Sequence, residues 1–219
     1  MYTRFAKRTA PVNRNASFGR VPSAAERTLG RGFIEAEERS APALAGAPSG
    51  WQQGYGIYDE AGKKLKSFTP LPHFEGGSWQ GGRKMPDPKL GWLLLTAEGG
   101  HPGAVALGAT VRRWVAPKDA VVSITGVLAH RQAQGDGVRA RIAGSRLGEL
   151  ASWTAHNTEA ETAMSRVEVK AGDFIDFIVD CRGEESHDSF AWAPVIRTVE
   201  TATATGASPA QEWSAAKGF

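Results

Sequence analysis

The chain has 219 residues, of which 41% are hydrophobic and 22% are charged, an ordinary composition for a globular protein. No run approaches the roughly 18 apolar residues of a membrane-spanning helix, which excludes a membrane span in this sequence. The net charge is +3, yet the first twenty residues hold five basic residues and no acid, leaving 21 basic against 23 acidic residues elsewhere. Because nucleic-acid binding requires a basic surface on the folded part, the balance argues against DNA or RNA as a partner. The single cysteine, Cys181, excludes an internal disulfide and a thiolate metal cluster.

The N-terminal fifty residues are predicted to precede the folded domain. Residues 1–20 show no sustained period and predict a disordered basic tail. We expect a helix over 21–40, with Ser23 and Glu26 forming a capping box. Residues 41–50 are a linker rich in Ala, Pro, Gly and Ser. The basic segment over residues 1–20 is also typical of a transit peptide, but no apolar region of a secretory signal follows it. A mobile tail, or a chain that is a fragment of a longer protein, explains it more simply.

A β-domain is predicted over 51–198. Residues 54–58 and 65–68 flank a turn and indicate a hairpin, whereas 67–91 are irregular, aromatic and expected to pack on the sheets. Residues 167–170 alternate between apolar and charged, 171–173 supply a turn, and 174–179 are almost continuously apolar. This order is typical of strands in a packed sheet. Eight strands are expected, at 92–97, 109–116, 121–130, 138–143, 150–154, 164–170, 174–181 and 190–197. The pattern favours a jelly-roll β-sandwich, followed by a C-terminal linker over 199–219.

Several motifs occur in order between Trp51 and Ile196: WQxGYG (51–56), FTPLPHF (68–74), WQGG (79–82), GGHPG (99–103), RRWxAP (112–117) and GDGVRARI (135–142). They resemble a β-module of large multidomain planctomycete proteins that carry a cytochrome-c-like domain and domains of unknown function. GRxPSxxE (19–26) is similar to a helical segment that precedes this module. The resemblance implies an extracytoplasmic, periplasmic or secreted, multidomain protein. It also implies likeness to galactose-binding and carbohydrate-binding jelly rolls, while the haem motif Cys-x-x-Cys-His is absent.

Aromatic residues are the first candidates for ligand binding, because an aromatic ring stacks on the C–H face of a sugar. Trp79 lies in an irregular Gly-rich segment, and we expect it to form a glycan platform with Tyr55 or Tyr58. Trp51 has an even chance of exposure by the same argument. Three tryptophans in apolar segments are expected in the core instead: Trp114, Trp153 and Trp192.

Arginines on adjacent strands are the second candidates. Four lie on such strands: Arg112, Arg113, Arg139 and Arg141. Arg139 and Arg141 share one face of their strand, and paired guanidinium groups bind carboxylates or sulfates, so an anionic polysaccharide is a fitting partner for them and Arg112. The alternative is a solvated face with salt bridges to Glu149 and Glu168.

The acidic loop before 190 is a candidate for a structural calcium ion. Asp180, Glu184 and Asp188 supply the oxygen atoms that calcium prefers, although an ordinary acidic loop explains them as well. The histidines show no zinc-binding spacing.

These observations predict a non-catalytic, carbohydrate-binding-like accessory module, with no cofactor beyond that calcium ion. One alternative is a structural spacer that packs on neighbouring domains and binds nothing. The other is a hydrolase that acts through His187 and Asp188.

Overall fold

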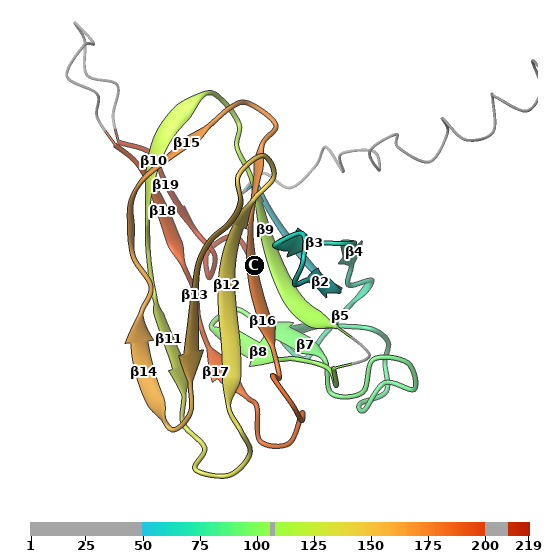
Figure 1. Cartoon of the computed structure of the whole chain (residues 1–219). Helices are drawn as coiled ribbons and strands as arrows, with labels where there is room; N and C mark the ends of the chain where they lie inside the picture. The colour runs from blue at the N-terminus through green and yellow to red at the C-terminus, as the bar shows by residue number, and fades with distance from the viewer. Residues whose placement is uncertain (1–49, 106–107, 200–209) are drawn as a thin grey trace, which may run out of the picture. The chain divides into compact units, whose positions relative to one another are not determined.

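The computed structural model describes residues 50–105, 108–199 and 210–219, which form antiparallel β-sheets and confirm the predicted all-β sandwich (Figure 1). The predicted basic tail, the helix over 21–40 and the linker up to residue 49 lie outside the described residues. In the described part, no helix has the length and apolar character needed to cross a membrane.

One layer is a six-stranded sheet in the order β13-β12-β16-β9-β1-β4. Its strands are β1 (Trp51–Gly56), β4 (Thr69–Pro70), β9 (Ala109–Val115), β12 (Val138–Gly144), β13 (Gly148–Ala155) and β16 (Phe174–Asp180). The small predicted hairpin is confirmed as β2 (Tyr58–Asp59) and β3 (Lys64–Leu65), in which Tyr58 pairs with Leu65.

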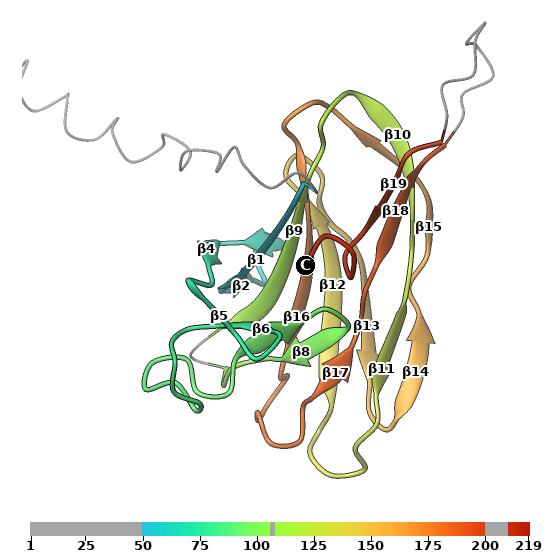
Figure 2. The same ribbon diagram turned by 180° about the vertical axis from the view of Figure 1, so that it is seen from behind.

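The facing layer consists of two sheets (Figures 1 and 2). They continue into one another, because several chain segments contribute one strand to each sheet. The first, in the order β15-β10-β18-β19, contains β10 (Ala120–Thr125), β15 (Met164–Val169), β18 (Val195–Thr198) and β19 (Glu212–Ser214). The second, in the order β14-β11-β17-β8-β7-β6-β5, contains β5 (His73–Glu75), β6 (Ser78–Gln80), β7 (Leu94–Thr96), β8 (Gly99–His101), β11 (Val127–His130), β14 (Thr158–Glu161) and β17 (Phe190–Ala191). Only Gly126 separates β10 from β11, so the predicted strand over 121–130 is interrupted at one residue.

The continuously apolar β16 is covered on both faces, as its sequence predicts. Ile175, Phe177 and Val179 alternate along the strand and lie in the main core between the layers. Ile178 points the other way into a small second core, where Tyr58, Leu65 and Phe68 pack against it. The β2–β3 hairpin therefore covers part of the far face of the six-stranded sheet.

The last ten residues differ from the linker predicted over 199–219. Residues 210–219 are folded onto the domain, and β19 pairs with β18 through Trp213 and Ile196. Trp213 packs against Trp114 at 5.1 Å between ring centroids, and Ala215 is fully buried. The polar run before residue 210 suggested a linker, but Trp213, Ala215 and Phe219 supply the apolar surface that returns the chain to the core.

The irregular stretch 67–91 packs on the sandwich, as predicted. Leu71 and Leu90 are buried members of the main core. Between them, β5 and β6 form a short hairpin that continues through β7 and β8 to β17. β8 runs across the direction of β16 and β9 in both views (Figures 1 and 2). The stretch thus extends one sheet and supports the segment that follows it, around Trp92.

Candidate functional site

A surface hollow of about 320 Å³ lies at the β7–β8 hairpin and the start of β17. Seven residues line it: Trp92, Leu94, Thr96, Gly100, His101, Ser189 and Phe190. The volume is at the lower end of the ~300–1,000 Å³ range typical of small-molecule sites. The hollow therefore has room for a small ligand or for one unit of a polymer.

Trp92 lies in the turn before β7 and is presented to solvent. Leu93 and Leu95 are buried in the core, so the side chains of Trp92, Leu94 and Thr96 point to the other side of the segment. Trp92 remains 49% exposed, which makes it one of the most exposed large apolar side chains in the described residues. An exposed tryptophan at the edge of a hollow offers a flat apolar face together with an indole N–H donor.

Polar groups stand beside this ring. His101 Nδ1 lies 2.7 Å from the carbonyl oxygen of Pro102, to which it donates a hydrogen bond. In the neutral imidazole this arrangement leaves Nε2 as an acceptor. The exposed Ser189 hydroxyl both donates and accepts. The lining thus combines apolar contact with hydrogen-bonding groups, and none of its residues is Asp, Glu, Lys or Arg.

Arg112 holds the hollow from beneath. The structure places this predicted ligand-binding side chain inside the protein, 2% exposed. Its Nη2 donates to the carbonyl oxygens of Thr96 at 2.5 Å and Gly99 at 2.9 Å, which fixes both ends of the β7–β8 turn. Burial lowers the pKa of Arg112 to about 10, and the guanidinium remains charged at neutral pH. Arg112 therefore positions the floor of the hollow and does not face solvent.

The other predicted arginines form ion pairs with carboxylates of the six-stranded sheet and of the β2–β3 turn. Arg141 is 1% exposed; it contacts Asp180, Glu60 at 2.5 Å and Glu149 at 3.3 Å. Arg139 donates to Glu60 at 2.7 Å and to Asp180 at 3.3 Å. We call these five residues the arginine cluster. Of the two predicted salt-bridge partners, Glu149 is confirmed, whereas Glu168 lies 3.7 Å from Arg166 instead.

The Tyr58 ring packs against the arginine cluster. The guanidinium carbon of Arg141 lies 4.0 Å from the centre of the Tyr58 ring, and the Tyr58 hydroxyl donates to Glu149 at 2.5 Å. Burial and the bond to Glu149 raise the pKa of this phenol. Two cations face three carboxylates, so the cluster has no excess positive charge to attract an anionic polymer.

Trp79 and Tyr55 lie elsewhere, partly buried against the main core. Trp79 on β6 pairs with Phe74 on β5, with their ring centroids 5.2 Å apart. Tyr55 lies on β1, between Thr69 and Thr110 of the neighbouring strands. The six predicted ligand-binding side chains are thus not gathered on one surface. Only Tyr58, Arg139 and Arg141 come together.

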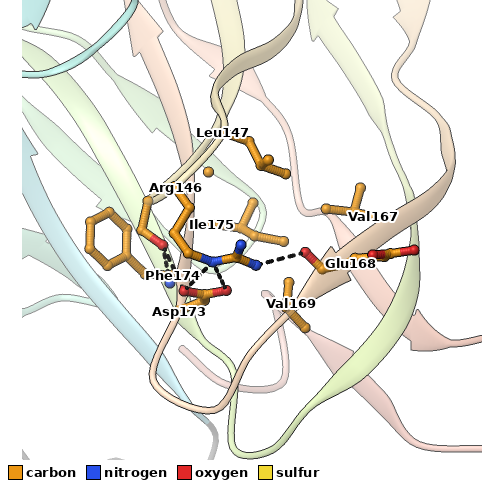
Figure 3. Close-up of a pocket in the computed structure, with 10 residues that line it drawn as sticks. Arg146, Leu147, Val167, Glu168, Val169, Asp173, Phe174 and Ile175 are labelled. Atoms are coloured by element: carbon orange, nitrogen blue, oxygen red, sulfur yellow. Dashed lines mark hydrogen bonds and ion pairs between the residues drawn. The ribbon is translucent and has the colours of Figure 1, made fainter.

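A second depression, at the β12–β13 turn, is filled by its own residues (Figure 3). Arg146 extends across apolar side chains that include Leu147 and Ile175, and its Nε donates to both oxygens of Asp173, at 2.8 and 3.0 Å. About 10 Å³ remains accessible, which is close to the minimum that can hold one water molecule. The ion pair leaves this depression no room for a larger ligand.

The predicted calcium ligands do not form one cluster. Among the described residues, no three His, Cys, Asp or Glu side chains converge in a way that suits a metal ion. Asp180 is bonded to the arginine cluster, and Glu184 is exposed. Asp188 is fully buried, 3.7 Å from His130. The acidic loop is therefore divided between a salt-bridge network and a buried carboxylate.

Comparisons with known proteins give no family for this chain. No protein-family model matches it, and neither does any curated protein sequence. A PA14 sugar-binding domain from an RTX adhesin is similar in structure, with a TM-score of 0.29 and 8% sequence identity. The similarity covers 49% of this chain and 52% of that one, so the chain spans about half the length of its structural neighbour. The planctomycete resemblance stays a prediction.

Sequence reasoning missed Trp92 because it treated residues 92–97 as one strand with an apolar interior. The run Trp92-Leu93-Leu94-Leu95 carries no alternation that distinguishes its two sides. The preceding Gly91, which has φ +61°, is the one local signal that the chain enters this segment from a turn. Trp92 is therefore exposed although its neighbours are core residues.

Proposed function

We propose that this β-sandwich is a non-catalytic, carbohydrate-binding-like module that takes a neutral sugar unit in the Trp92 hollow. The observation that carries the proposal is the half-exposed Trp92 ring beside a hollow lined with hydrogen-bonding groups. A sugar ring has an apolar C–H face and peripheral hydroxyl groups, and these match the indole face and the polar atoms of His101 and Ser189.

A neutral ligand fits better than an anionic one. The lining contains no Lys or Arg side chain, and the guanidinium groups of Arg139 and Arg141 are already paired with carboxylates. Binding without catalysis also agrees with the lining. Glycoside hydrolysis ordinarily uses two carboxyl groups that face the bond, and the residues around this hollow supply neither.

The wider role that we propose is that of an accessory module in an extracytoplasmic multidomain protein. It rests on the motifs in 51–142 that resemble such a module. In this role the domain would hold its parent protein close to a polysaccharide, and weak binding at one hollow would be strengthened by other modules of the same chain.

Affinity electrophoresis through gels that contain neutral or sulfated polysaccharides tests this proposal. We expect retardation of the wild type by at least one neutral polysaccharide and loss of that retardation in Trp92→Ala. Trp92→Phe should retain part of it, since a phenyl ring still stacks. Trp79→Ala and Arg139→Ala are the matched controls at the earlier predicted sites, and both should be retarded like the wild type.

Three results would contradict the proposal. Absence of retardation on every neutral and sulfated polysaccharide would favour the spacer alternative, in which the domain only packs on its neighbours. Retardation that survives in Trp92→Ala but disappears in Arg139→Ala would move the binding surface to the arginine cluster. Turnover of a glycoside or ester substrate that is lost in Asp188→Ala would favour the hydrolase alternative.

A further inference from the structure

Two loops that each join the six-stranded sheet to the facing layer meet at one end of the sandwich. The loop over 131–137 joins β11 to β12, and the loop over 181–189 joins β16 to β17; both lie at the lower end in Figures 1 and 2. The backbone N–H of Gly183 donates to Asp136 Oδ2 at 2.9 Å, and the Arg182 guanidinium donates to the Asp136 carbonyl. The loops are therefore in direct contact through Asp136.

Carboxylate oxygens at this junction lack hydrogen-bond donors. The Asp188 side chain is fully buried, and neither of its oxygens has a hydrogen-bond partner in the described residues. Asp136 Oδ1 is likewise buried without a partner, although Oδ2 of the same group is bonded. An unpaired buried carboxylate is costly, so a structure that retains one requires a compensating group.

The neighbouring His130 does not provide that compensation. Its Nε2 lies 3.7 Å from Asp188 Oδ1 but only 2.9 Å from the carbonyl oxygen of His187, to which it donates. Its Nδ1 accepts the backbone N–H of Asn157 at 3.2 Å. With one nitrogen donating and the other accepting, the imidazole is neutral. The buried carboxylate thus faces an uncharged ring.

The surrounding charges are mainly negative. Burial is the largest cause that raises the pKa of Asp188, to about 7, and the carboxylates of Asp136, Glu184 and Asp180 raise it further. The guanidinium of Arg182 opposes them. The same negative charge contributes to a raised pKa of the buried Cys181 thiol, which is about 11. A cation bound here would lie in a favourable potential.

We infer that the two loops bind a calcium ion through the carboxylates of Asp136 and Asp188. Both groups offer hard oxygen ligands, which calcium prefers, and calcium accepts six to eight of them in irregular geometry. Because no third acidic side chain converges there, backbone carbonyls and water complete the coordination. Beside Gly135, a Cβ atom would lie 2.4 Å from the Ser186 carbonyl oxygen and 3.6 Å from Asp188 Oδ1, so these two oxygens approach the same space.

This site replaces the ligand set predicted from the sequence. Asp188 is retained, whereas Asp180 is committed to Arg139 and Arg141. Asp136 takes the place of Glu184, because it comes from the other loop and one of its oxygens is buried and unpaired. Nothing in the sequence around Asp136 shows that the loop before β12 will lie beside the loop that follows β16.

The site also adjoins the hollow. Asp188 directly precedes Ser189 and Phe190, which line the hollow. A calcium ion would therefore hold the segment that presents the Ser189 hydroxyl. This consequence rests on the proposed sugar-binding function, whereas the calcium site itself does not.

Isothermal titration of the full chain with calcium chloride, after removal of divalent ions with EDTA, tests the inference. We expect saturable binding of one calcium ion per chain and a rise in the midpoint of thermal unfolding. Asp188→Asn and Asp136→Asn should each weaken binding by at least about tenfold. Asp119→Asn is the matched control, since Asp119 is a loop carboxylate on the exposed surface that pairs with Lys170 at 2.9 Å, and its titration should equal that of the wild type.

Absence of saturable binding up to about 10 mM calcium, above the weakest protein calcium sites, would overturn the inference. Equal calcium affinities in the wild type and in Asp136→Asn would also overturn it. Asp136→Asn keeps the buried Asp188 intact, so it tests the inference even if Asp188→Asn fails to fold. Polysaccharide retardation measured with calcium and with EDTA separates the two proposals. Calcium binding without retardation would refute only the sugar-binding function, and retardation without calcium binding would refute only the ion site.

Discussion

The arginine cluster and the Trp92 hollow differ in which of their side chains are left available after folding. Arg139 and Arg141 alternate on one strand and suggest an anion site, yet their guanidinium groups are occupied by Glu60, Glu149 and Asp180. Trp92 lies in an apolar run and suggests core, yet its ring is half exposed beside a hollow. The difference teaches that available binding capacity depends on which groups are left unpaired after folding.

Among the variants that test this comparison, Arg112→Ala should cause the largest loss of stability. The change removes the donor for the Thr96 and Gly99 carbonyl oxygens and leaves a void beneath the hollow. We expect a loss of about 4 kcal/mol in the free energy of unfolding, measured by urea denaturation. Any remaining sugar affinity should also fall, since the β7–β8 turn loses its support. A loss below about 1 kcal/mol would contradict the positioning role of Arg112.

Arg141→Ala should affect stability while leaving the hollow intact. Its removal leaves Asp180 and Glu149 as neighbouring, partly buried carboxylates without their shared cation. We expect a loss of about 3 kcal/mol in urea denaturation, with polysaccharide affinity unchanged within about twofold. Arg139→Ala is the matched control, and its cost should stay below about 1 kcal/mol because that side chain is 35% exposed. Equal costs for the two variants would refute the structural account of the cluster.

Stability in calcium-free buffer should decrease as the pH rises from about 4 to about 7. The folded protein holds the Asp188 proton with a pKa of about 7, against an ordinary value of 3.8, so it binds more protons than the unfolded chain in this range. The decrease attributable to Asp188 should be on the order of 2 kcal/mol and absent in Asp188→Asn. Calcium should oppose it, because the metal binds the ionised form. Urea denaturation at several pH values measures both effects, and identical profiles for the wild type and Asp188→Asn would refute the assignment.

Trp92→Ala should have the smallest effect on stability. The half-exposed ring contributes little burial compared with the fully buried Trp114 or Trp192. We expect the midpoint of urea unfolding to change by the equivalent of less than about 1 kcal/mol. A larger loss would indicate that Trp92 is a core residue in solution, and loss of binding in that variant would then have a structural cause.

Most strands between residues 109 and 198 were predictable because their periodicity and turns agree with the tertiary structure. The strand β14 was not predicted, and the predicted strand over 190–197 is divided into β17 and β18. The continuous apolar run of β16 predicted burial on both faces, and this is confirmed by Phe177 and Ile178, which lie in different cores. The core positions of Trp114 and Trp192 are confirmed as well. Residues 210–219 were predicted wrongly, because nothing in a short segment indicates that Trp213 will find Trp114.

The candidate sites were less predictable, since each depends on contacts between distant segments. Arg141 meets Glu60, 81 residues away, and Asp136 meets Gly183, 47 residues away. Composition gives the residue types of such groups and leaves their pairing open. Pairing decides whether an arginine or a carboxylate is structural or available to a ligand.

The claim that the Trp92 hollow binds a neutral sugar is tested most directly by NMR titration of the isotopically labelled protein. The ligand is a neutral oligosaccharide derived from a polysaccharide that retards the protein in affinity electrophoresis. The account predicts that the indole N–H signal of Trp92, assigned with Trp92→Phe, shifts together with the amide signals of Thr96, Gly100, His101 and Ser189. The guanidinium Nε–H signals of Arg139 and Arg141 should not move. Shifts concentrated on those two arginines and Tyr58, with the Trp92 indole signal unchanged, would contradict it.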